Sequence, residues 1–135
     1  MAINVKLADY QNDFINLGGI KAMIGGYGAG KSYTEAHQIL WYIFKYPQKP
    51  GLIMSVKTSL LMKTIVDPLF DMLRRYKIPF RKNEQLKTIY VSLLPGKETE
   101  IYWETYNNYK EMVGVNCAWA VLDEIDVTPY AYEVW

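Results

Sequence analysis

The sequence predicts an α/β fold in which helices flank a parallel β-sheet that carries an inserted β-hairpin. Three observations predict it: short apolar runs typical of buried strands alternate with amphipathic helical segments, a glycine-rich turn precedes the first long helix, and two acidic residues follow the last apolar run. The chain has 135 residues, of which 50% are hydrophobic and 21% charged. These values are typical of globular proteins and fit a single domain over residues 1–135.

Each element has a local signal. Apolar residues recur at helical spacing over 7–17, 31–45 and 59–76, and buried-type strands are expected over 20–24, 51–56 and 118–122. Pro68 implies either a kink in the third helix or a restart with Asp67 as its N-cap. We expect 105–112 to be a polar helix or a loop.

A β-hairpin is expected over residues 87–103. Ile89, Val91 and Leu93 alternate with polar residues before the turn at 95–96, and the same alternation follows that turn. The order strand, helix, strand, helix, hairpin, strand favours a parallel sheet, and we expect this sheet to be incomplete within 135 residues.

Charge and cysteine content exclude several classes of protein. Fifteen basic and fourteen acidic residues leave a formal net charge of +1, so composition alone gives no sign of a nucleic-acid partner. Cys117 is the only cysteine and His37 the only histidine, which excludes an internal disulfide and a zinc site built from this chain. We expect Cys117 to be packed and His37 to be exposed. Residues 1–14 lack the apolar region of a signal peptide, and no uncharged run reaches the roughly 18 residues of a membrane span. A soluble protein of the cytoplasm, without a membrane partner, is expected.

The strongest motif is a phosphate-binding loop. The stretch GGYGAGKS matches the pattern G-x-x-x-x-G-K-[ST], and it comprises Gly25, Gly26, Tyr27, Gly28, Ala29, Gly30, Lys31 and Ser32, with Tyr33 next to it on the helix. Glycines let consecutive backbone N–H groups point at phosphate oxygens, and the helix that follows adds its free N–H groups and dipole. Lys31 is predicted to reach the β- and γ-phosphates of ATP, and the Ser32 hydroxyl to coordinate Mg²⁺. The alternative is a glycine-rich turn with a fortuitous Lys-Ser pair.

Asp123 and Glu124 follow the apolar run 118–122. Acidic residues at the carboxyl end of a buried strand lie beside the phosphate loop in folds of this kind. Asp123 is predicted to hold the Mg²⁺ shell, and Glu124 to polarise the attacking water as a general base. The alternative is a pair of acids that cap the next helix.

Other candidates carry weaker signals. Gln11 lies ahead of the loop, and its carboxamide has the donor and acceptor that an adenine edge requires; any surface glutamine has the same groups. Lys57 and Thr58 follow the second strand, where they would contact a nucleotide or DNA phosphate, or simply begin a helix. Any of the three arginines would serve as an arginine finger, although surface solvation explains each of them as well: Arg74, Arg75 and Arg81.

Taken together, these motifs resemble the ATPase part of the large terminase subunit of tailed bacteriophages. The segments that carry the resemblance are 7–14, 25–32, 56–58, Asp67-Pro68, 112–116 and 120–126. The Gly-Val-Asn step at 114–116, shortly before the acidic strand end, favours terminases over helicases. The resemblance implies a P-loop NTPase of the RecA-like (ASCE) type. It matches Lys31 and Ser32 to the phosphate and metal positions, Asp123 and Glu124 to the metal and catalytic carboxylates, and Gln11 to the adenine glutamine.

The resemblance also implies a role and partners. Such an ATPase hydrolyses ATP with Mg²⁺ to drive double-stranded viral DNA into a procapsid in the host cytoplasm. Its implied partners are the DNA, a portal protein, a small terminase subunit and further copies of itself in a ring. We expect no nuclease domain within these residues and weak or absent turnover by this chain alone. The alternatives are another RecA-like DNA-dependent ATPase, such as a helicase, and a non-catalytic nucleotide-binding module.

Overall fold

A five-stranded mixed sheet forms the centre of the molecule, as the computed structural model describes it for residues 5–24 and 28–125. The strands lie in the order β2-β3-β4-β1-β5. Their bounds are β1 Gly51–Ser55, β2 Phe80–Asn83, β3 Thr88–Leu94, β4 Lys97–Thr105 and β5 Trp119–Leu122. The helical elements are α1 Asp9–Asn16, α2 Lys31–Lys45, α3 Thr58–Leu61, η1 Met62–Val66, α4 Asp67–Arg75 and η2 Tyr106–Met112.

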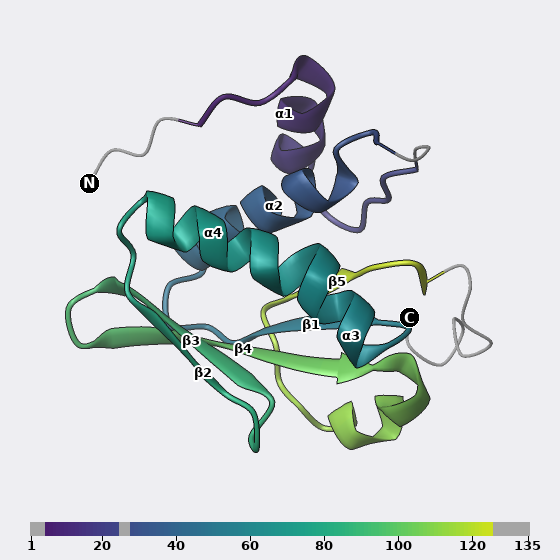
Figure 1. The fold of residues 1–135 in the computed structure, drawn as a ribbon, viewed down its shortest axis with the longest axis vertical. Helices are drawn as coiled ribbons and strands as arrows, with labels where there is room; N and C mark the ends of the chain where they lie inside the picture. The colour runs from purple at the N-terminus through teal and green to yellow at the C-terminus, as the bar shows by residue number, and fades with distance from the viewer. Residues whose placement is uncertain (1–4, 25–27, 126–135) are drawn as a thin grey trace.

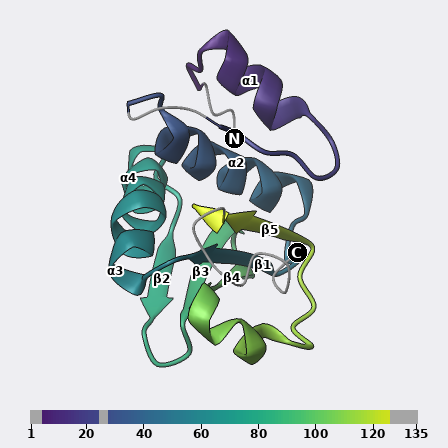
Figure 2. The same ribbon diagram turned by 90° about the vertical axis from the view of Figure 1, so that its right-hand side faces the viewer.

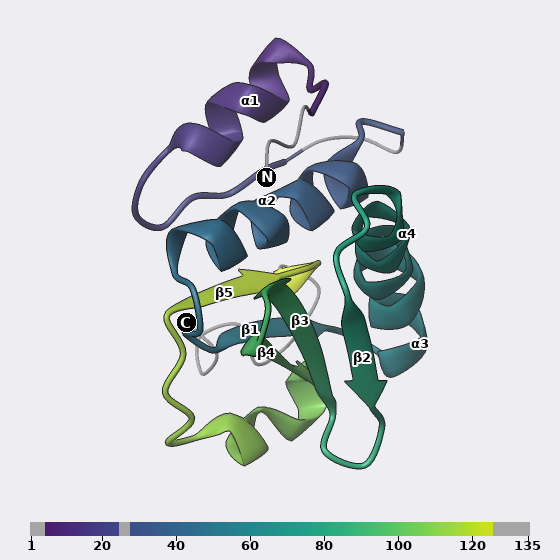
Figure 3. The same ribbon diagram turned by 90° about the vertical axis from the view of Figure 1, so that its left-hand side faces the viewer.

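The helices form layers on the two faces of the sheet (Figures 1 and 2). Helices α2 and α4 pack side by side over one face, α1 lies beyond α2, and η2 lies on the opposite side (Figure 3). The core between α2, α4 and the sheet is mostly aliphatic, with fully buried side chains that include Ile39, Ile43, Ile53, Leu69 and Ile101. The predicted α/β fold with flanking helices is therefore confirmed.

The parallel part of the sheet is built around β1. This strand pairs in parallel with β4 on one side and with β5 on the other. At its first residue, Gly51 is opposite Trp119 of β5, and a Cβ on Gly51 would lie 2.1 Å from the Trp119 ring. The ring stacks on Tyr42 of α2 with centroids 5.3 Å apart. Gly51 therefore provides the space in which Trp119 joins α2 to the sheet.

The predicted hairpin is confirmed as β3 and β4, which pair in antiparallel register. Strand β2 was not predicted from the sequence; it extends the hairpin through pairs such as Phe80 with Val91. Phe80 also stacks on Phe70 of α4, with ring centroids 4.4 Å apart. Because β4 lies in parallel beside β1, the hairpin is continuous with the main sheet.

The helical stretch after β1 is continuous but irregular. A π-helical turn, η1, joins α3 to α4. Pro68 has no N–H for the regular helical bond to the carbonyl four residues earlier, and it lies in the first turn of α4, just after the wide turn. Asp67 has helical dihedral angles (φ −61°, ψ −47°) and forms no side-chain cap, so the chain does not restart there.

The expected strand over 20–24 is not formed. Ile20 and Ile24 are 85% and 97% exposed, and these residues have no strand partner in the described sheet. Lys21 explains part of this, because its ammonium group donates to the carbonyl oxygens of Phe14, Ile15 and Leu17 at 2.7, 2.9 and 3.0 Å. These bonds satisfy free carbonyls at the end of α1 and hold the segment against that helix.

His37 is buried rather than exposed, with 5% of its surface accessible. Helix α2 packs against both α4 and β5, so the side chains covered by its neighbours extend beyond the apolar stripe. The His37 ring packs on Tyr33, with centroids 4.2 Å apart, and its Nδ1 lies 2.9 Å from the Tyr33 carbonyl oxygen. Cys117 is half-buried, and burial raises the pKa of its thiol. Within residues 5–24 and 28–125, none of the helices has the length and apolar character that crossing a membrane requires.

Candidate active site

The end of the predicted phosphate loop runs directly into the first turn of α2. Gly28 and Gly30 have φ of +79° and +74°, left-handed values that glycine adopts without steric cost. Gly30 is the N-cap residue of α2, which begins at Lys31. The first N–H groups of this 15-residue helix have no carbonyl partner within the helix, and they therefore suit an anion. Gly25, Gly26 and Tyr27 lie outside the described residues.

Lys31 and Ser32, the last two residues of the predicted loop, and Tyr33 next to it occupy this first turn. Lys31 and Ser32 are half-buried, whereas Tyr33 is 40% exposed. The Tyr33 ring lies against His37, and its hydroxyl is 3.5 Å from the carbonyl oxygen of Lys6. Tyr33 is thus engaged with its own helix and with the segment before α1.

Asp123 is held at the end of β5 by three other elements. Its N–H donates to the carbonyl oxygen of Met54 on β1 at 2.9 Å. Its carbonyl oxygen accepts a 2.7 Å hydrogen bond from the hydroxyl of Tyr106, which is fully buried at the start of η2. Its carboxylate Oδ2 lies 3.1 Å from the hydroxyl of Thr64 on η1 and 3.5 Å from that of Ser55 on β1. Asp123 therefore has a fixed position, as a metal-binding carboxylate requires.

The structure adds Glu35, which the sequence analysis did not single out. Glu35 lies four residues after Lys31 on α2, and its side chain forms a hydrogen bond with that of Asp123. Burial, the negative charge of Asp123, the hydrogen bond to it and the charge of Glu124 together raise the pKa of Glu35 to about 8, against the opposing effect of Lys31. The spacing was the available signal, since residues three or four apart share a helix face. This spacing alone does not indicate a partner for Glu35, because the partner, Asp123, follows β5, and only the folded structure places β5 beside α2.

Glu124 lines a cavity that two lysines also line. This cavity has a volume of about 450 Å³, and its other lining residues follow β1: Val56, Lys57, Ser59, Leu60 and Lys63. The backbone of Glu124 has a φ of +51°, which is uncommon for a residue with a side chain and is found more often at functional sites. The structure thus places Lys57 beside the predicted general base and adds Lys63, which the sequence analysis did not identify.

Gln11 joins α1 to the phosphate loop. Its side chain is buried, and its Oε1 accepts a 2.9 Å hydrogen bond from the N–H of Ala8. Its Nε2 donates to Thr34 Oγ1 at 2.9 Å and lies 3.4 Å from the carbonyl oxygen of Gly30. The neighbouring Tyr10 hydroxyl donates to the carbonyl oxygen of Ala29 at 3.1 Å. Gln11, the residue predicted to contact adenine, therefore lies next to the loop, and its carboxamide forms hydrogen bonds with other groups of the protein.

The oxygen donors of this site fit a magnesium ion. Ser32, Asp123 and Glu35 offer a hydroxyl and two carboxyl groups, the hard ligands that Mg²⁺ prefers. The described part of the chain holds no cluster of three or more His, Cys, Asp or Glu side chains able to bind a metal. Mg²⁺ typically takes one or two carboxylates and completes its shell with phosphate oxygens and water.

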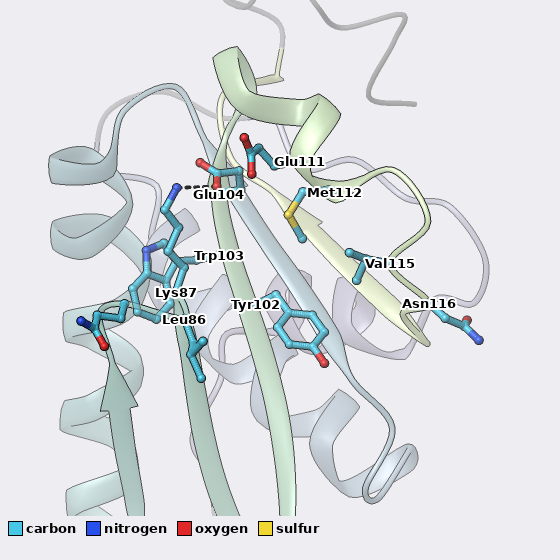
Figure 4. A pocket seen from close by; sticks show the side chains of 10 residues that line it. Leu86, Lys87, Tyr102, Trp103, Glu104, Glu111, Met112, Val115 and Asn116 are labelled. Atoms are coloured by element: carbon cyan, nitrogen blue, oxygen red, sulfur yellow. Dashed lines mark hydrogen bonds and ion pairs between the residues drawn. The ribbon is translucent and has the colours of Figure 1, made fainter.

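A second cavity, of about 670 Å³, lies between the sheet and η2 (Figure 4). Lys87 on its wall donates a 2.6 Å hydrogen bond to Glu104 Oε2, and Oε1 accepts from Thr105 N–H and Asn108. Burial alone would raise the pKa of Glu104, but these hydrogen bonds and the charge of Lys87 outweigh it and lower the pKa. Val115 and Asn116 of the Gly-Val-Asn step also line this cavity. The step therefore lies on the side of the sheet that faces η2.

Solved structures of similar shape include large terminases of phages. The large terminase from a thermophilic bacteriophage superimposes with a TM-score of 0.74 at 14% identity, covering 95% of this chain and 33% of that one. The same protein in complex with ATP-gamma-S gives 0.68 at 16% identity, with 81% and 26% covered. The large terminase ATPase domain of Thermus phage P74-26 gives 0.59 at 15% identity, with 78% and 48% covered.

The present chain thus spans less than half the length of each of these chains. No family model matches the sequence, and no curated protein matches it. At 14–16% identity the likeness concerns the fold alone. The chain therefore has an α/β fold like that of these large terminases.

Proposed function

We propose that this chain binds ATP with Mg²⁺ and is the nucleotide-hydrolysing part of a viral DNA-packaging motor. One observation carries the proposal. Gly28 and Gly30, both with left-handed backbone, lead directly into Lys31 at the start of α2. Glu35 of the same helix lies beside Asp123 at the end of β5. A phosphate-binding helix start and a fixed carboxylate at a strand end are the two parts that phosphoryl transfer requires. The known structures of similar fold include terminases in complex with ADP and with ATP-gamma-S, which supports nucleotide binding.

Each residue of the site has its own proposed role. The loop N–H groups and Lys31 bind the phosphates and offset the charge that develops on them. Ser32 and Asp123 would hold Mg²⁺, which would neutralise phosphate charge when bound. Glu124 accepts a proton from the attacking water. Gln11 contacts the adenine once its carboxamide is released from the groups that now engage it.

The proposed wider role is supported by the neighbours of similar fold. The large terminases of the thermophilic bacteriophage and of Thermus phage P74-26 share this fold, which supports the packaging-motor ATPase over other RecA-like enzymes. Double-stranded DNA, a portal protein, a small terminase subunit and further copies of this chain in a ring are the proposed partners, in the host cytoplasm. Lys57 and Lys63 beside Glu124 offer a place where bound DNA would influence hydrolysis.

A pair of substitutions tests the proposal. Lys31→Ala removes a charged donor to phosphate, and we expect the affinity for a fluorescent ATP analogue to fall by about 10- to 150-fold, the equivalent of about 1.5–3 kcal/mol. Glu124→Gln is expected to keep binding and lose hydrolysis, measured as phosphate release with the packaging partners present. Lys97→Ala, an exposed lysine at the hairpin turn, is the control. Equal affinity in Lys31→Ala and the parent contradicts the nucleotide site, and parental hydrolysis by Glu124→Gln contradicts its role as the base.

A further inference from the structure

Exposed apolar side chains line the 670 Å³ cavity between the sheet and η2. Leu86, on the turn between β2 and β3, is 62% exposed, and Val115, on the segment after η2, is 38% exposed. The ring of Tyr102 on β4 lies between them (Figure 4). Its hydroxyl donates to the Glu100 carboxylate, which holds the ring in place. Apolar side chains that meet water along one cavity are typical of a surface that binds another protein, where an apolar group of the partner covers them.

The charge of this cavity is negative. Glu104 is already neutralised, because the Lys87 ammonium group lies 2.6 Å from its carboxylate. Glu111 lines the same cavity, is exposed, and forms no ion pair within residues 5–24 and 28–125. A complementary partner therefore presents a positive charge beside its apolar side chain.

The chain itself carries such a surface at the end of α2. Phe44 is 45% exposed in the last turn of the helix. Lys45 follows it, with its ammonium group 4.5 Å from the centre of the Trp41 ring. The N–H of Lys49 donates to the Tyr46 carbonyl oxygen at 3.1 Å, and this turn brings Lys49 back towards the helix end. Both lysines are exposed, and neither forms an ion pair with the described residues.

The two surfaces lie on different sides of the molecule. Helix α2 covers one face of the sheet, whereas the cavity and η2 lie at the opposite face (Figure 3). The Phe44 surface of a chain therefore cannot reach the cavity of the same chain. A contact between two distinct surfaces joins copies head to tail, as in a ring or a filament.

We propose that the cavity beside η2 receives Phe44 of a second copy of this chain, with the two lysines that flank Phe44 facing Glu111. An aromatic side chain that enters a pocket and becomes shielded from water is the usual centre of a protein interface. This inference rests on the proposed function in one respect, since further copies of the chain are partners there. It names the surfaces through which they meet, and it requires no bound nucleotide.

Mixing two variants tests the contact. Phe44→Asp removes the ring from one surface, and Leu86→Asp places a charge in the wall of the other. Sedimentation velocity of the whole chain over a range of concentrations, without nucleotide, measures self-association. We expect the parent to self-associate and the association constant of each variant to fall about tenfold or more.

An equal mixture of these variants is expected to form a dimer with one copy of each. Phe44→Asp keeps an intact cavity and Leu86→Asp keeps an intact Phe44 surface, so one good contact remains between them. A variant that has lost its fold cannot restore association in this way, which separates a loss of contact from a loss of structure.

Two further variants test charge and specificity. Glu111→Lys reverses the free charge of the cavity and is expected to weaken self-association at low ionic strength, where charges are least screened. Ile24→Asp is the matched control, because Ile24 is an apolar side chain with 97% exposure that belongs to neither surface. It is expected to associate as the parent does.

Several results would overturn the inference: a parent that stays monomeric up to about 1 mM, parental association by Phe44→Asp or Leu86→Asp, or no dimer in their mixture. Equal losses in Ile24→Asp and Phe44→Asp would overturn it as well, because they place the contact elsewhere. Titration of the parent with a fluorescent ATP analogue is a separate measurement. Self-association without nucleotide binding contradicts the proposed function alone, and nucleotide binding by a monomeric parent contradicts this inference alone.

Discussion

Thr64 on the π-helical turn η1 lies with its hydroxyl 3.1 Å from Oδ2 of Asp123 and 2.9 Å from the carbonyl oxygen of Leu60. The hydroxyl has one proton, so it serves one acceptor at a time. The π turn that precedes Pro68 thus brings a side-chain donor to the carboxylate at the end of β5. Wide helical turns of this type occur frequently at functional sites. The contact links the irregular helix to the candidate metal ligand.

Thr64→Val tests this link. Valine has nearly the same shape and no hydroxyl, so Asp123 loses a donor while the packing is kept. Mn²⁺ replaces Mg²⁺ as a probe, because free and bound Mn²⁺ are distinguished by electron paramagnetic resonance. We expect Mn²⁺ affinity in the presence of ATP to fall by about tenfold, the lower end of the effect of an outer-shell partner. The matched control is Thr105→Val, a half-buried threonine at the end of β4 whose side chain forms no cap on η2. Equal metal affinity in the two variants would show that the contact does not position Asp123.

Gly51→Ala is expected to destabilise the fold. The new Cβ would lie 2.1 Å from the Trp119 ring, which is packed between the sheet and Tyr42 and cannot move without disturbing both. Overpacking of this kind costs about 1–3 kcal/mol, measured as the free energy of unfolding in urea. Gly18→Ala is the control, because Gly18 has open space around it and lacks a left-handed φ. A stable Gly51→Ala variant would contradict the tight approach of β1 and β5.

Gln11→Ala is expected to loosen the phosphate loop. The variant leaves the N–H of Ala8 and the hydroxyl of Thr34 without their carboxamide partner, at a cost of about 1–3 kcal/mol. Hydrogen–deuterium exchange of residues 28–34 should become faster, because α1 no longer holds the carbonyl side of the loop. Asn12→Ala, an exposed residue of the same helix, should leave exchange there unchanged. Unchanged exchange in Gln11→Ala would mean that Tyr10 alone holds the loop.

His37 is expected to make the fold sensitive to acid. Burial lowers the pKa of His37 from its usual 6.5, an effect that Arg75 strengthens and the hydrogen bond to the Tyr33 carbonyl oxygen opposes. The unfolded chain takes up a proton near pH 6.5 that the folded chain resists, so the contribution is complete above that pH and is lost as the pH falls towards the lowered folded-state pKa.

The measurement is the free energy of unfolding at about pH 7.5 and about pH 5.5, on either side of the usual histidine pKa. His37→Asn keeps a donor for the Tyr33 carbonyl oxygen and removes the titration. Because His37 is the only histidine, the loss of stability on acidification should be larger in the parent than in the variant. Equal losses in both proteins would contradict the burial of a neutral ring.

Much of the architecture was predictable because its signals are local. Helix α2 has the bounds that its apolar periodicity and Pro47 predicted, and the turn at Gly96 placed the hairpin correctly. The segment over 20–24 was predicted wrongly, because an apolar run becomes a strand only if a neighbouring strand pairs with it. Strand β2 was missed for a similar reason: its exposed, charged residues form a strand because β3 offers them a partner.

By itself, the sequence determined the chemical parts of the site: a glycine loop that tolerates left-handed backbone, a lysine and a serine at a helix start, and an acidic pair after a buried strand. Those properties depend on residue type and on spacing along one segment. Only the tertiary structure decided that Glu35 meets Asp123 and that Lys57 and Lys63 lie beside Glu124. The physical reason is that parallel pairing of β1 and β5 under α2 joins residues that lie far apart along the chain, and no local pattern encodes such contacts.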